Sequence, residues 1–368
     1  MSQQGINPKQ IKSYNDTALL YLLSAEGKLS RKAISAKLGL TAAAVSKITK
    51  RLIDSDKIEE LGVSEQDSDR VGRKEVLLSL KSTDKFSLCI TAELDTVTYS
   101  LCDVGGKLIK SIAYDFFDEC ELIVEKAKEF LATCEKEKER IIGIGLCVVG
   151  SVKKDAFGVW DNENLVAMLE TELGLPVAIQ NNVKAYALAE LIYGDVTDAP
   201  SVLFFKWGSG IGSAVAASGK LLLDSDYSLT EIGHYIVDPA GEHCRCGRYG
   251  CLETIASARK LTLETGGLSL EEIVASEDER VIHLLDQKID IVALALTNTA
   301  TILNAHQIVL FGKIFENNRI VEKLARQCAR YNNNFKHNKI VRGDLSDKSA
   351  YIGAAAVSAQ QFFFTEQE

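Results

Sequence analysis

The 368-residue sequence contains no run of about 18 apolar residues, the length that a membrane-spanning helix needs. Residues 1–14 are polar and lack the apolar core of a secretory signal peptide. These two absences argue against membrane and secreted proteins and predict a cytoplasmic protein with no membrane partner. The composition, 46% hydrophobic and 25% charged, is ordinary for a globular protein, and the length predicts two or three domains.

The chain also lacks an excess of basic residues, because its net charge is −9. This argues against a protein that coats nucleic acid along its whole length. The charge is uneven, however. Residues 1–82 hold 14 of the 42 Lys and Arg and 10 of the 51 Asp and Glu, a net of +4, which leaves −13 for the rest. A basic head on an acidic body is typical of a small DNA-binding module joined to another domain.

Residues 14–82 have the pattern of such a module. Leucines at helical spacing predict a helix over 14–27 that ends at a glycine. Ser30 is a favourable N-cap for a second helix, and Thr41 for a third that follows the Gly39-Leu40 turn. Two helices joined by a short glycine-containing turn form a helix-turn-helix, whose second helix enters the major groove by its N-terminal end.

The residues expected to contact DNA lie on this third helix and on a β-hairpin wing predicted to follow it. The first residues of the helix are small. Helical spacing places Ser46, Lys47, Lys50 and Arg51 on its surface, and the first three of these can reach base edges or phosphates. A glycine between two arginines in the wing suits a narrow, A·T-rich minor groove, although alone it fits a solvated turn equally well. The predicted DNA-binding residues are Thr41, Ala42, Ala43, Ser46, Lys47, Lys50, Arg70, Arg73 and Lys74.

Three of the nine cysteines are crowded together. Cys244, Cys246 and Cys251 fall within eight residues, and the glycines between them let a short loop turn the thiolates toward one centre. His234, ten residues earlier, can supply a fourth ligand, and His243 competes for that place. Three thiolates and an imidazole form the closed tetrahedral set of a structural zinc, and these soft ligands favour zinc over magnesium or calcium.

The other six cysteines stand in apolar contexts, and we expect them to be buried free thiols because the cytosol keeps thiols reduced. They are Cys89, Cys102, Cys120, Cys134, Cys147 and Cys328.

After residue 82, predicted strands and helices alternate, which indicates an α/β body. The expected helices include 119–136, 288–304 and 316–336. Glycine loops follow several of the predicted strands, and such loops are natural places for a ligand.

The body resembles the ROK family, which groups sugar-responsive repressors with bacterial sugar kinases on an actin-like, two-lobed α/β fold. The likeness runs from about residue 14 to residue 358, and the segment EIGHYIVDPAGEHCRCGRYGCLE is its most specific part. Further segments carry it at 142–152, 180–182, 207–222, 304–312 and 349–357.

This resemblance implies three regions. A winged helix-turn-helix covers 1–82, as in the repressor branch of the family. A first lobe covers 83–195 and is joined by a C-terminal helix at 348–368. A second lobe covers 196–347 and contains the zinc site and helices used for oligomerisation. The resemblance also places the family's histidine ligand in a Glu-x-Gly-His segment, which favours His234 over His243.

The resemblance further implies a sugar-binding cleft between the lobes. Asn181-Asn182 matches an Asn-Asp pair of the family, and Glu253 matches a glutamate two residues after the last zinc cysteine. Asn164 falls where the family has an asparagine before this pair. Taken singly, the asparagine pair is also compatible with a turn, and Glu253 with a helix start. The predicted sugar-binding residues are Asn164, Asn181, Asn182, Glu231, His234 and Glu253.

Two departures from the family's kinases predict that this chain is not an enzyme. The kinases have an aspartate as the second residue of the Asn-Asp pair, where it accepts the proton of the attacking hydroxyl, whereas Asn182 has no useful basicity. Residues 91–96 replace a glycine-containing phosphate loop, and Glu93 and Asp95 would repel ATP. The glycines at 208–212 remain, as a simple turn or as a site for the phosphate of a sugar phosphate.

Together these features predict a sugar-responsive transcription repressor of carbohydrate metabolism genes. A sugar or sugar phosphate would bind between the lobes and change how two heads meet operator DNA, which we expect to be palindromic with A/T-rich flanks. A homodimer or homotetramer is therefore required. One alternative is a sugar kinase that carries a DNA-binding head and still phosphorylates its sugar from ATP. A second is a DNA-binding protein with no small ligand, whose body serves only for dimerisation. The preference for a repressor over an activator follows from the resemblance alone.

Overall fold

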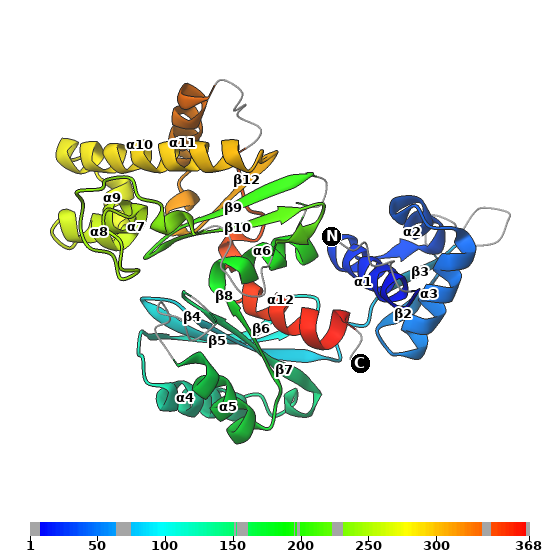
Figure 1. Ribbon diagram of the computed structural model, residues 1–368. Helices are drawn as coiled ribbons and strands as arrows, with labels where there is room; N and C mark the ends of the chain where they lie inside the picture. Colours follow the sequence, from blue (N-terminus) through cyan, green and yellow to red (C-terminus); the bar gives the residue numbers. More distant parts are fainter. Residues whose placement is uncertain are drawn as a thin grey trace.

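In a computed structural model of the chain, the residues described are 8–63, 75–150, 152, 161–194, 196, 199–222, 231–332 and 340–365. They form a small head and a body of two lobes, each built on a five-stranded sheet (Figure 1). This confirms the predicted fold class, a winged helix-turn-helix followed by a two-lobed α/β body. Among the described helices, none is both long and apolar enough to cross a membrane.

The second and third helices of the head begin at the caps that the sequence predicts, whereas the first begins at Pro8, six residues before the expected start at residue 14. The Ser30 and Thr41 side chains accept hydrogen bonds from the amides of Ala33 and Ala44, each at 3.2 Å, and so cap the second and third helices. Gly39 ends the second helix in a left-handed conformation (φ 64°). The elements are α1 Pro8–Glu26, β1 Leu29–Ser30, α2 Arg31–Leu38, α3 Ala42–Asp54, β2 Ile58–Val63 and β3 Val76–Leu80, with strand order β1-β3-β2.

The first lobe is a mixed sheet with the strand order β6-β5-β4-β7-β8. Its first strand, β4, is buried along its whole length; β4, β5 and β6 pair antiparallel, and β7 and β8 continue in parallel on the other side of β4. The elements are β4 Phe86–Ala92, β5 Thr96–Asp103, β6 Leu108–Asp115, α4 Cys120–Ala132, β7 Ile141–Val148, α5 Asn162–Leu173 and β8 Val177–Asn181.

The second lobe repeats this topology with the strand order β11-β10-β9-β12-β13. Again the first three strands pair antiparallel and the last two in parallel. The elements are β9 Ser201–Trp207, β10 Ile211–Ala217, β11 Lys220–Leu221, α7 Leu252–Ala256, α8 Ala258–Glu264, α9 Leu270–Ala275, α10 Glu279–Ile302, β12 Gln307–Phe311, α11 Asn318–Tyr331 and β13 Ile340–Arg342.

Two helices connect the parts of the molecule, α6 (Asn182–Tyr193) and α12 (Ile352–Ala359), which pack on each other. Every residue of α12 is buried. It lies very close to β7, because a Cβ added to Gly145 would lie 1.9 Å from the carbonyl oxygen of Ala354. Figure 1 shows α12 in red, pointing toward the head.

A π-helix at Gln360–Phe364 continues α12 and meets α1 of the head. Phe363 and Phe364 are buried in a core that also contains the leucines of α1. The ring of Phe364 meets that of Tyr21 edge-on with centroids 5.2 Å apart, and the Thr17 hydroxyl donates to the Phe364 carbonyl at 3.2 Å. The C-terminal segment therefore packs in the body through α12 and contacts the head through Phe363 and Phe364.

Candidate functional site

Helix α3 has a buried face and an exposed face. Val45, Ile48 and Leu52 are buried against the rest of the head. The predicted DNA contacts on this helix and its cap are all exposed: Thr41, Ala42, Ala43, Ser46, Lys47 and Lys50. The structure therefore leaves the leading end of α3 free to approach a duplex, as a helix-turn-helix requires.

The other predicted DNA contacts are not placed in this way. Arg70, Arg73 and Lys74 lie outside the described residues. Arg51, which the sequence pattern assigns to the surface, turns inward instead, and its Nε donates to the buried Asp16 carboxylate at 2.8 Å. This pair ties α3 to α1, so Arg51 stabilises the head rather than reaching for DNA.

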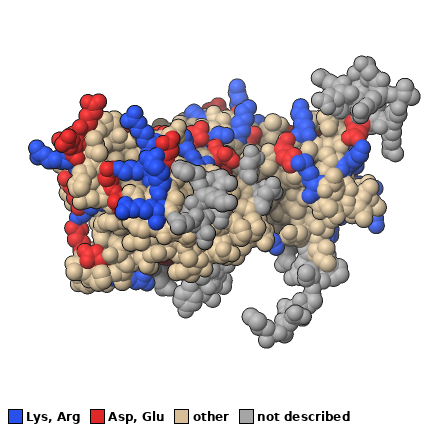
Figure 2. Space-filling model, turned by 90° about the horizontal axis from the view of Figure 1, so that it is seen from above, with Lys and Arg blue, Asp and Glu red and all other residues tan. Residues whose placement is uncertain are grey.

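Charges of both signs share the surface of the molecule. Seen from above, Lys and Arg side chains lie among Asp and Glu side chains on the body and on the described part of the head (Figure 2). On the head, Arg31 pairs with Glu60 and Lys37 with Glu26, each at 2.8 Å. The described residues visible in this view therefore form no broad basic face.

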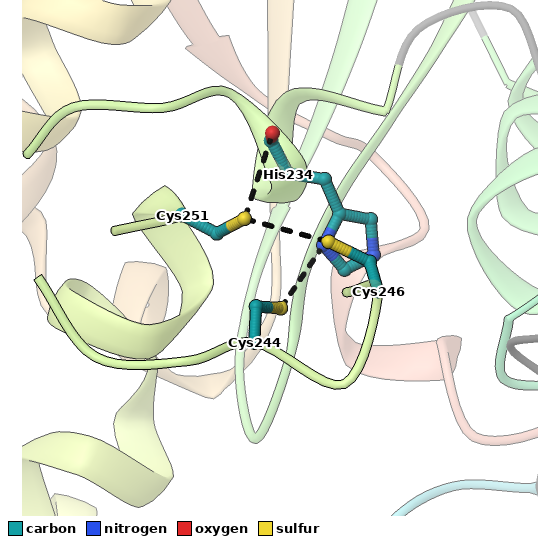
Figure 3. Close-up of side chains that lie close together, drawn as sticks. All are labelled: His234, Cys244, Cys246 and Cys251. Carbon is teal, nitrogen blue, oxygen red and sulfur yellow. Dashed lines mark hydrogen bonds between the residues drawn. The ribbon is translucent and has the colours of Figure 1, made fainter. Parts of the chain in front are cut away.

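The three crowded cysteines and His234 form a cluster in the second lobe (Figure 3). Their four candidate ligand atoms all lie within 4.8 Å of one another. Cys244 Sγ is 3.5 Å from His234 Nδ1, and Cys246 Sγ is 3.5 Å from Cys251 Sγ. His243, the competing histidine, instead packs its ring against Tyr249, with centroids 5.0 Å apart.

The loop that carries the cysteines depends on its glycines. Gly247 and Gly250 have positive φ angles of 83° and 64°, and a Cβ on Gly250 would lie 1.4 Å from the Asp238 carbonyl oxygen. Gly233 is equally constrained, because its added Cβ would lie 2.0 Å from the Ile211 carbonyl oxygen. The first contact packs the cysteine loop on the segment that follows the Glu-x-Gly-His turn, and the second packs that turn on β10. The backbone thus positions a donor set of three thiols and an imidazole, which fits a metal ion.

The thiols of the cluster differ in acidity. Burial raises the pKa of Cys244 and raises that of Cys251 to about 12. Burial acts in the same direction on Cys246, but hydrogen bonds from the Arg248 amide and from the other two thiols outweigh it and lower its pKa. Three clustered thiols with opposed shifts fit a site that loses protons as it takes up a cation. The six remaining cysteines are free and buried, as predicted.

A pocket lies between the lobes, next to the cluster. The first lobe contributes the residues that follow β4 and β7 to its lining. The second lobe contributes the start of β10 and the cysteine loop, and α6 lines the pocket between them. Five of the six predicted sugar-binding residues line it: Asn181, Asn182, Glu231, His234 and Glu253. The sixth, Asn164, is exposed on α5 with its side-chain amide 3.5 Å from the sulfur of Met168, and it is not among the described lining residues.

The two asparagines at the start of α6 have different partners. The side-chain oxygen of Asn181, Oδ1, caps α6 by accepting hydrogen bonds from the backbone amides of Val183 and Lys184. Its side-chain nitrogen, Nδ2, donates to the Gly150 carbonyl at 2.9 Å. Asn182 donates to Glu93 Oε1 at 2.8 Å. Asn181 therefore fixes the helix and the end of β7, while Asn182 reaches across to the loop after β4.

Glu93 also receives a lysine from the opposite lobe. Lys206, on β9, places Nζ 2.6 Å and 2.5 Å from the two carboxylate oxygens. The Lys206 side chain is 14% exposed and that of Glu93 is 23% exposed. The sequence suggests a bare acidic loop at 91–96; instead, a cross-lobe ion pair neutralises its glutamate.

Glu253 sits against the glycine loop of the second lobe. Its Oε2 accepts from the Ile211 amide at 2.9 Å, and its Oε1 lies 3.3 Å from the Arg245 guanidinium. A Cβ on Gly210 would lie 2.8 Å from the same Oε2, and one on Gly212 would lie 2.7 Å from Val183. The glycines at 208–212 thus make room for Glu253 and for α6.

Sequence reasoning misses three cations of this pocket, Lys184, Lys206 and Arg245. Lys206 interrupts the otherwise buried apolar strand SVLFFKW, and an ionic residue in such a strand is a usable signal because it needs a partner. Nothing in the pattern identifies that partner, however, since Glu93 is 113 residues away.

Comparisons with known proteins agree with this architecture. The ROK family model matches residues 117–361, and a model described as winged helix-turn-helix DNA-binding matches residues 12–59. The chain is 25% identical to the N-acetylglucosamine repressor of Escherichia coli O6:H1, over 95% of this chain and 93% of that protein. It is 23% identical to the xylose repressor of Bacillus subtilis, over 96% of both.

A solved structure shows the same fold over nearly the whole chain. It is that of a ROK family transcriptional regulator described as a homologue of the Mlc protein of E. coli. The TM-score is 0.74 at 24% identity, and the match covers 96% of this chain and 97% of that one. With the family model spanning most of the body and the second model spanning the head, the chain belongs to the ROK family and carries an N-terminal winged helix-turn-helix.

Proposed function

We propose that the protein is a sugar-responsive transcription repressor of carbohydrate metabolism genes, as its relatives' names indicate for them. The observation that carries the proposal is the pocket between the lobes, which gathers amide, imidazole and carboxylate groups from separate segments. Groups of this kind read the hydroxyls of a sugar by hydrogen bonds. The two relatives are named after different sugars, N-acetylglucosamine and xylose. We therefore propose a sugar or sugar phosphate as the class of effector.

The head would bind operator DNA through the exposed end of α3. We assign the major-groove contacts to Thr41, Ala42, Ala43, Ser46, Lys47 and Lys50, and the minor-groove contacts to Arg70, Arg73 and Lys74 of the wing. One winged helix covers one half-site, so a palindromic operator with A/T-rich flanks needs a homodimer or homotetramer. Light scattering on the purified protein tests that assembly; a monomer at micromolar concentration would contradict it.

Helix α12 offers a route from the pocket to the head. Near its start, Ser349 and Gly353 border a small cavity that Glu93, Asn182 and Lys206 also line. At its other end, Phe363 and Phe364 are buried against α1. A change in lobe closure that moves α12 would therefore move the attachment of the head. The coupling must come from a difference between the two body states in their affinities for sugar and operator.

We assign a structural zinc ion to His234, Cys244, Cys246 and Cys251. Four protein ligands leave no open position, so the ion would serve to organise the site rather than to activate water. His234 lies in the same turn as Glu231, and Cys251 lies two residues before Glu253. The cluster therefore holds two pocket-lining carboxylates in place, which is the contribution we expect from the metal.

Phosphorylation of the sugar is not part of the proposal. Asn182 stands at the start of α6 and donates its amide to Glu93, so it offers no base to a sugar hydroxyl. Glu93, in the loop after β4, and Lys206, on β9, line the pocket as an ion pair. A coupled assay decides the point. ATP-dependent phosphorylation of a sugar that is lost in Asn182→Ala would establish the kinase alternative.

The sensor is tested by thermal-shift measurements on the full chain with xylose, glucose, N-acetylglucosamine and their phosphate esters. A compound that binds only the folded protein raises its melting temperature, and the rise grows with the ratio of ligand concentration to Kd. We expect at least one of these compounds to do so and to lose the effect in Glu253→Gln. If none shifts the melting temperature, the body does not bind this class of effector and serves only to dimerise the heads.

A further inference from the structure

The pocket between the lobes already contains its own anions. Glu93, Glu231 and Glu253 line it, and two of them are paired with its cations. Lys206 Nζ lies 2.5 Å from Glu93, and the Arg245 guanidinium lies 3.3 Å from Glu253. A phosphate group that entered here could bind Lys206 or Arg245 only by taking that cation from a carboxylate.

The glycine loop at 208–212 also has a carboxylate of the protein bound to it. Free amides in such a loop are a usual place for a phosphate. Here the Ile211 amide donates to Glu253 Oε2 at 2.9 Å, and the space left by Gly210 is taken by that same oxygen. The protein's own carboxylate therefore stands where an anionic ligand would meet the backbone.

Glu93 lines both the pocket between the lobes and the small cavity near the start of α12, so it stands at the inner side of the cleft. Its carboxylate receives Lys206 from the second lobe and the Asn182 amide at 2.8 Å from α6. Both members of the ion pair are largely buried, at 14% and 23% exposure. Displacing Glu93 from Lys206 would leave a poorly solvated carboxylate without its partner, which is costly.

We infer that this cleft takes an uncharged sugar and rejects sugar phosphates, and that Glu93 is the residue that keeps a phosphate out of the inner cleft. The inference rests on the proposed function and narrows its effector class. Sugar hydroxyls can donate to Glu231 and Glu253 without disturbing either ion pair. A phosphate dianion that drew Lys206 or Arg245 to itself would leave Glu93 or Glu253 without its cation beside a second anion, and like charges repel strongly in a partly buried site.

Calorimetric titration of the full-length protein tests this with matched pairs: xylose and xylose 1-phosphate, glucose and glucose 6-phosphate, N-acetylglucosamine and its 6-phosphate. For the sugar that binds, we expect the free form to bind at least about tenfold more tightly than its phosphate ester. In Glu93→Gln, which removes the charge and leaves Lys206 unpaired, the preference for the free sugar should fall by about tenfold. Glu172→Gln is the matched control, because Glu172 pairs with Lys128 at 2.5 Å on the exposed surface of the first lobe. This variant should keep the preference of the unsubstituted protein for the free sugar over its phosphate ester.

The outcomes separate the two proposals. A phosphate ester that binds the unsubstituted protein more tightly than its free sugar overturns the inference and leaves the sugar sensor standing. An unchanged preference in a folded Glu93→Gln variant overturns the role of Glu93. No binding by any of the six compounds overturns the sensor, and this inference with it. If Glu93→Gln does not fold, Asn182→Asp is the second variant; it adds charge beside Glu93 and should strengthen the rejection of phosphate.

Discussion

The two lobes of the body have the same strand order but different chemistry at the same turn. In the first lobe, the turn after the first strand contains Glu93 and Asp95, and in the second it contains Gly208 and Gly210. The acidic turn reaches across the cleft to Lys206, while the glycine turn receives Glu253 from its own lobe. A shared topology therefore fixes where the turns meet, and the side chains decide what can bind there.

The lobes also differ in how they hold their cleft-facing segments. Both lobes use close glycine contacts, and in the first lobe Gly145 lets α12 lie directly on β7. The second uses a cluster of three cysteines and a histidine to hold the turns of Glu231 and Glu253. We therefore expect the second lobe to depend on a metal and the first lobe not to, and this difference gives the largest predicted effect.

Cys251→Ala should remove the metal, whereas Cys89→Ala should not. Both thiols are buried, one in each lobe. Loss of one ligand from a closed set should lower metal content from about one ion per chain to near zero and destabilise the chain by about 3 kcal/mol or more. Elemental analysis with chemical denaturation measures both. Equal metal content in the two variants would contradict the site.

Lys206→Met should destabilise the body more than Lys128→Met. Lys206 neutralises a largely buried carboxylate across the cleft, while Lys128 pairs with Glu172 on the surface of one lobe. We expect a loss of about 1–3 kcal/mol for the first variant and less than about 1 kcal/mol for the second. Urea denaturation compares them, and equal losses would mean that the cross-lobe pair has no special role.

Gly210→Ala should weaken sugar binding, whereas Leu94→Ala in the corresponding turn of the first lobe should change it less. A Cβ at residue 210 would lie 2.8 Å from Glu253 Oε2 and must push this carboxylate from the Ile211 amide. Misplacing one polar contact should cost about tenfold in Kd. Calorimetry with the sugar identified above gives the comparison; an unaffected Gly210→Ala would show that Glu253 is not held by this loop.

The smallest predicted effect is a pH-dependent change in stability at the turn between the second and third strands of each lobe, which joins β5 to β6 in the first lobe and β10 to β11 in the second. Burial raises the pKa of Asp103, although the amides of Lys107 and Gly105 donate to its carboxylate and oppose the shift. A carboxyl with a raised folded-state pKa stabilises the fold below its unfolded pKa and loses this contribution as pH rises through the folded value. Asp103→Asn, whose carbonyl can accept the same bonds, should therefore gain stability relative to the unsubstituted protein as the pH rises above about 4, the unfolded pKa of an aspartate.

The turn between β10 and β11 provides the control for this pH effect. It is closed by Ser218 and Gly219 in left-handed conformations and has no carboxylate at the turn itself. Denaturation at several pH values should show a difference between Asp103→Asn and the unsubstituted chain that grows with pH, whereas the difference for Ser218→Asn stays constant. A pH-independent difference in the first case would mean that Asp103 is not strained by burial.

The sequence predicts the local features of the fold well because they depend on neighbouring residues. The caps Ser30 and Thr41 follow from side-chain chemistry within three residues. The cysteine cluster follows from spacing within one loop and one preceding turn. The domain limits at 82 and 195, and the roles of the site residues, stay predictions.

Long-range pairings are where sequence reasoning stops. Arg51 has the spacing of a surface residue, yet it reaches the buried Asp16 on another helix. The sequence predicts that Glu93 repels ATP, because nothing in it shows that Glu93 pairs with Lys206 of the opposite lobe. Both errors have one cause: a charge pattern shows that a partner is needed, but only the fold determines which residue supplies it.

The central claim is that occupancy of the cleft controls DNA binding by the head. The most direct test measures the affinity of the full-length protein for a DNA site that it selects from a random pool, with and without a saturating amount of the sugar that raises its melting temperature. We predict that the sugar weakens DNA binding, and that Glu253→Gln removes this effect but leaves binding without sugar unchanged. Equal DNA affinity with and without a sugar shown by calorimetry to be bound would contradict the account.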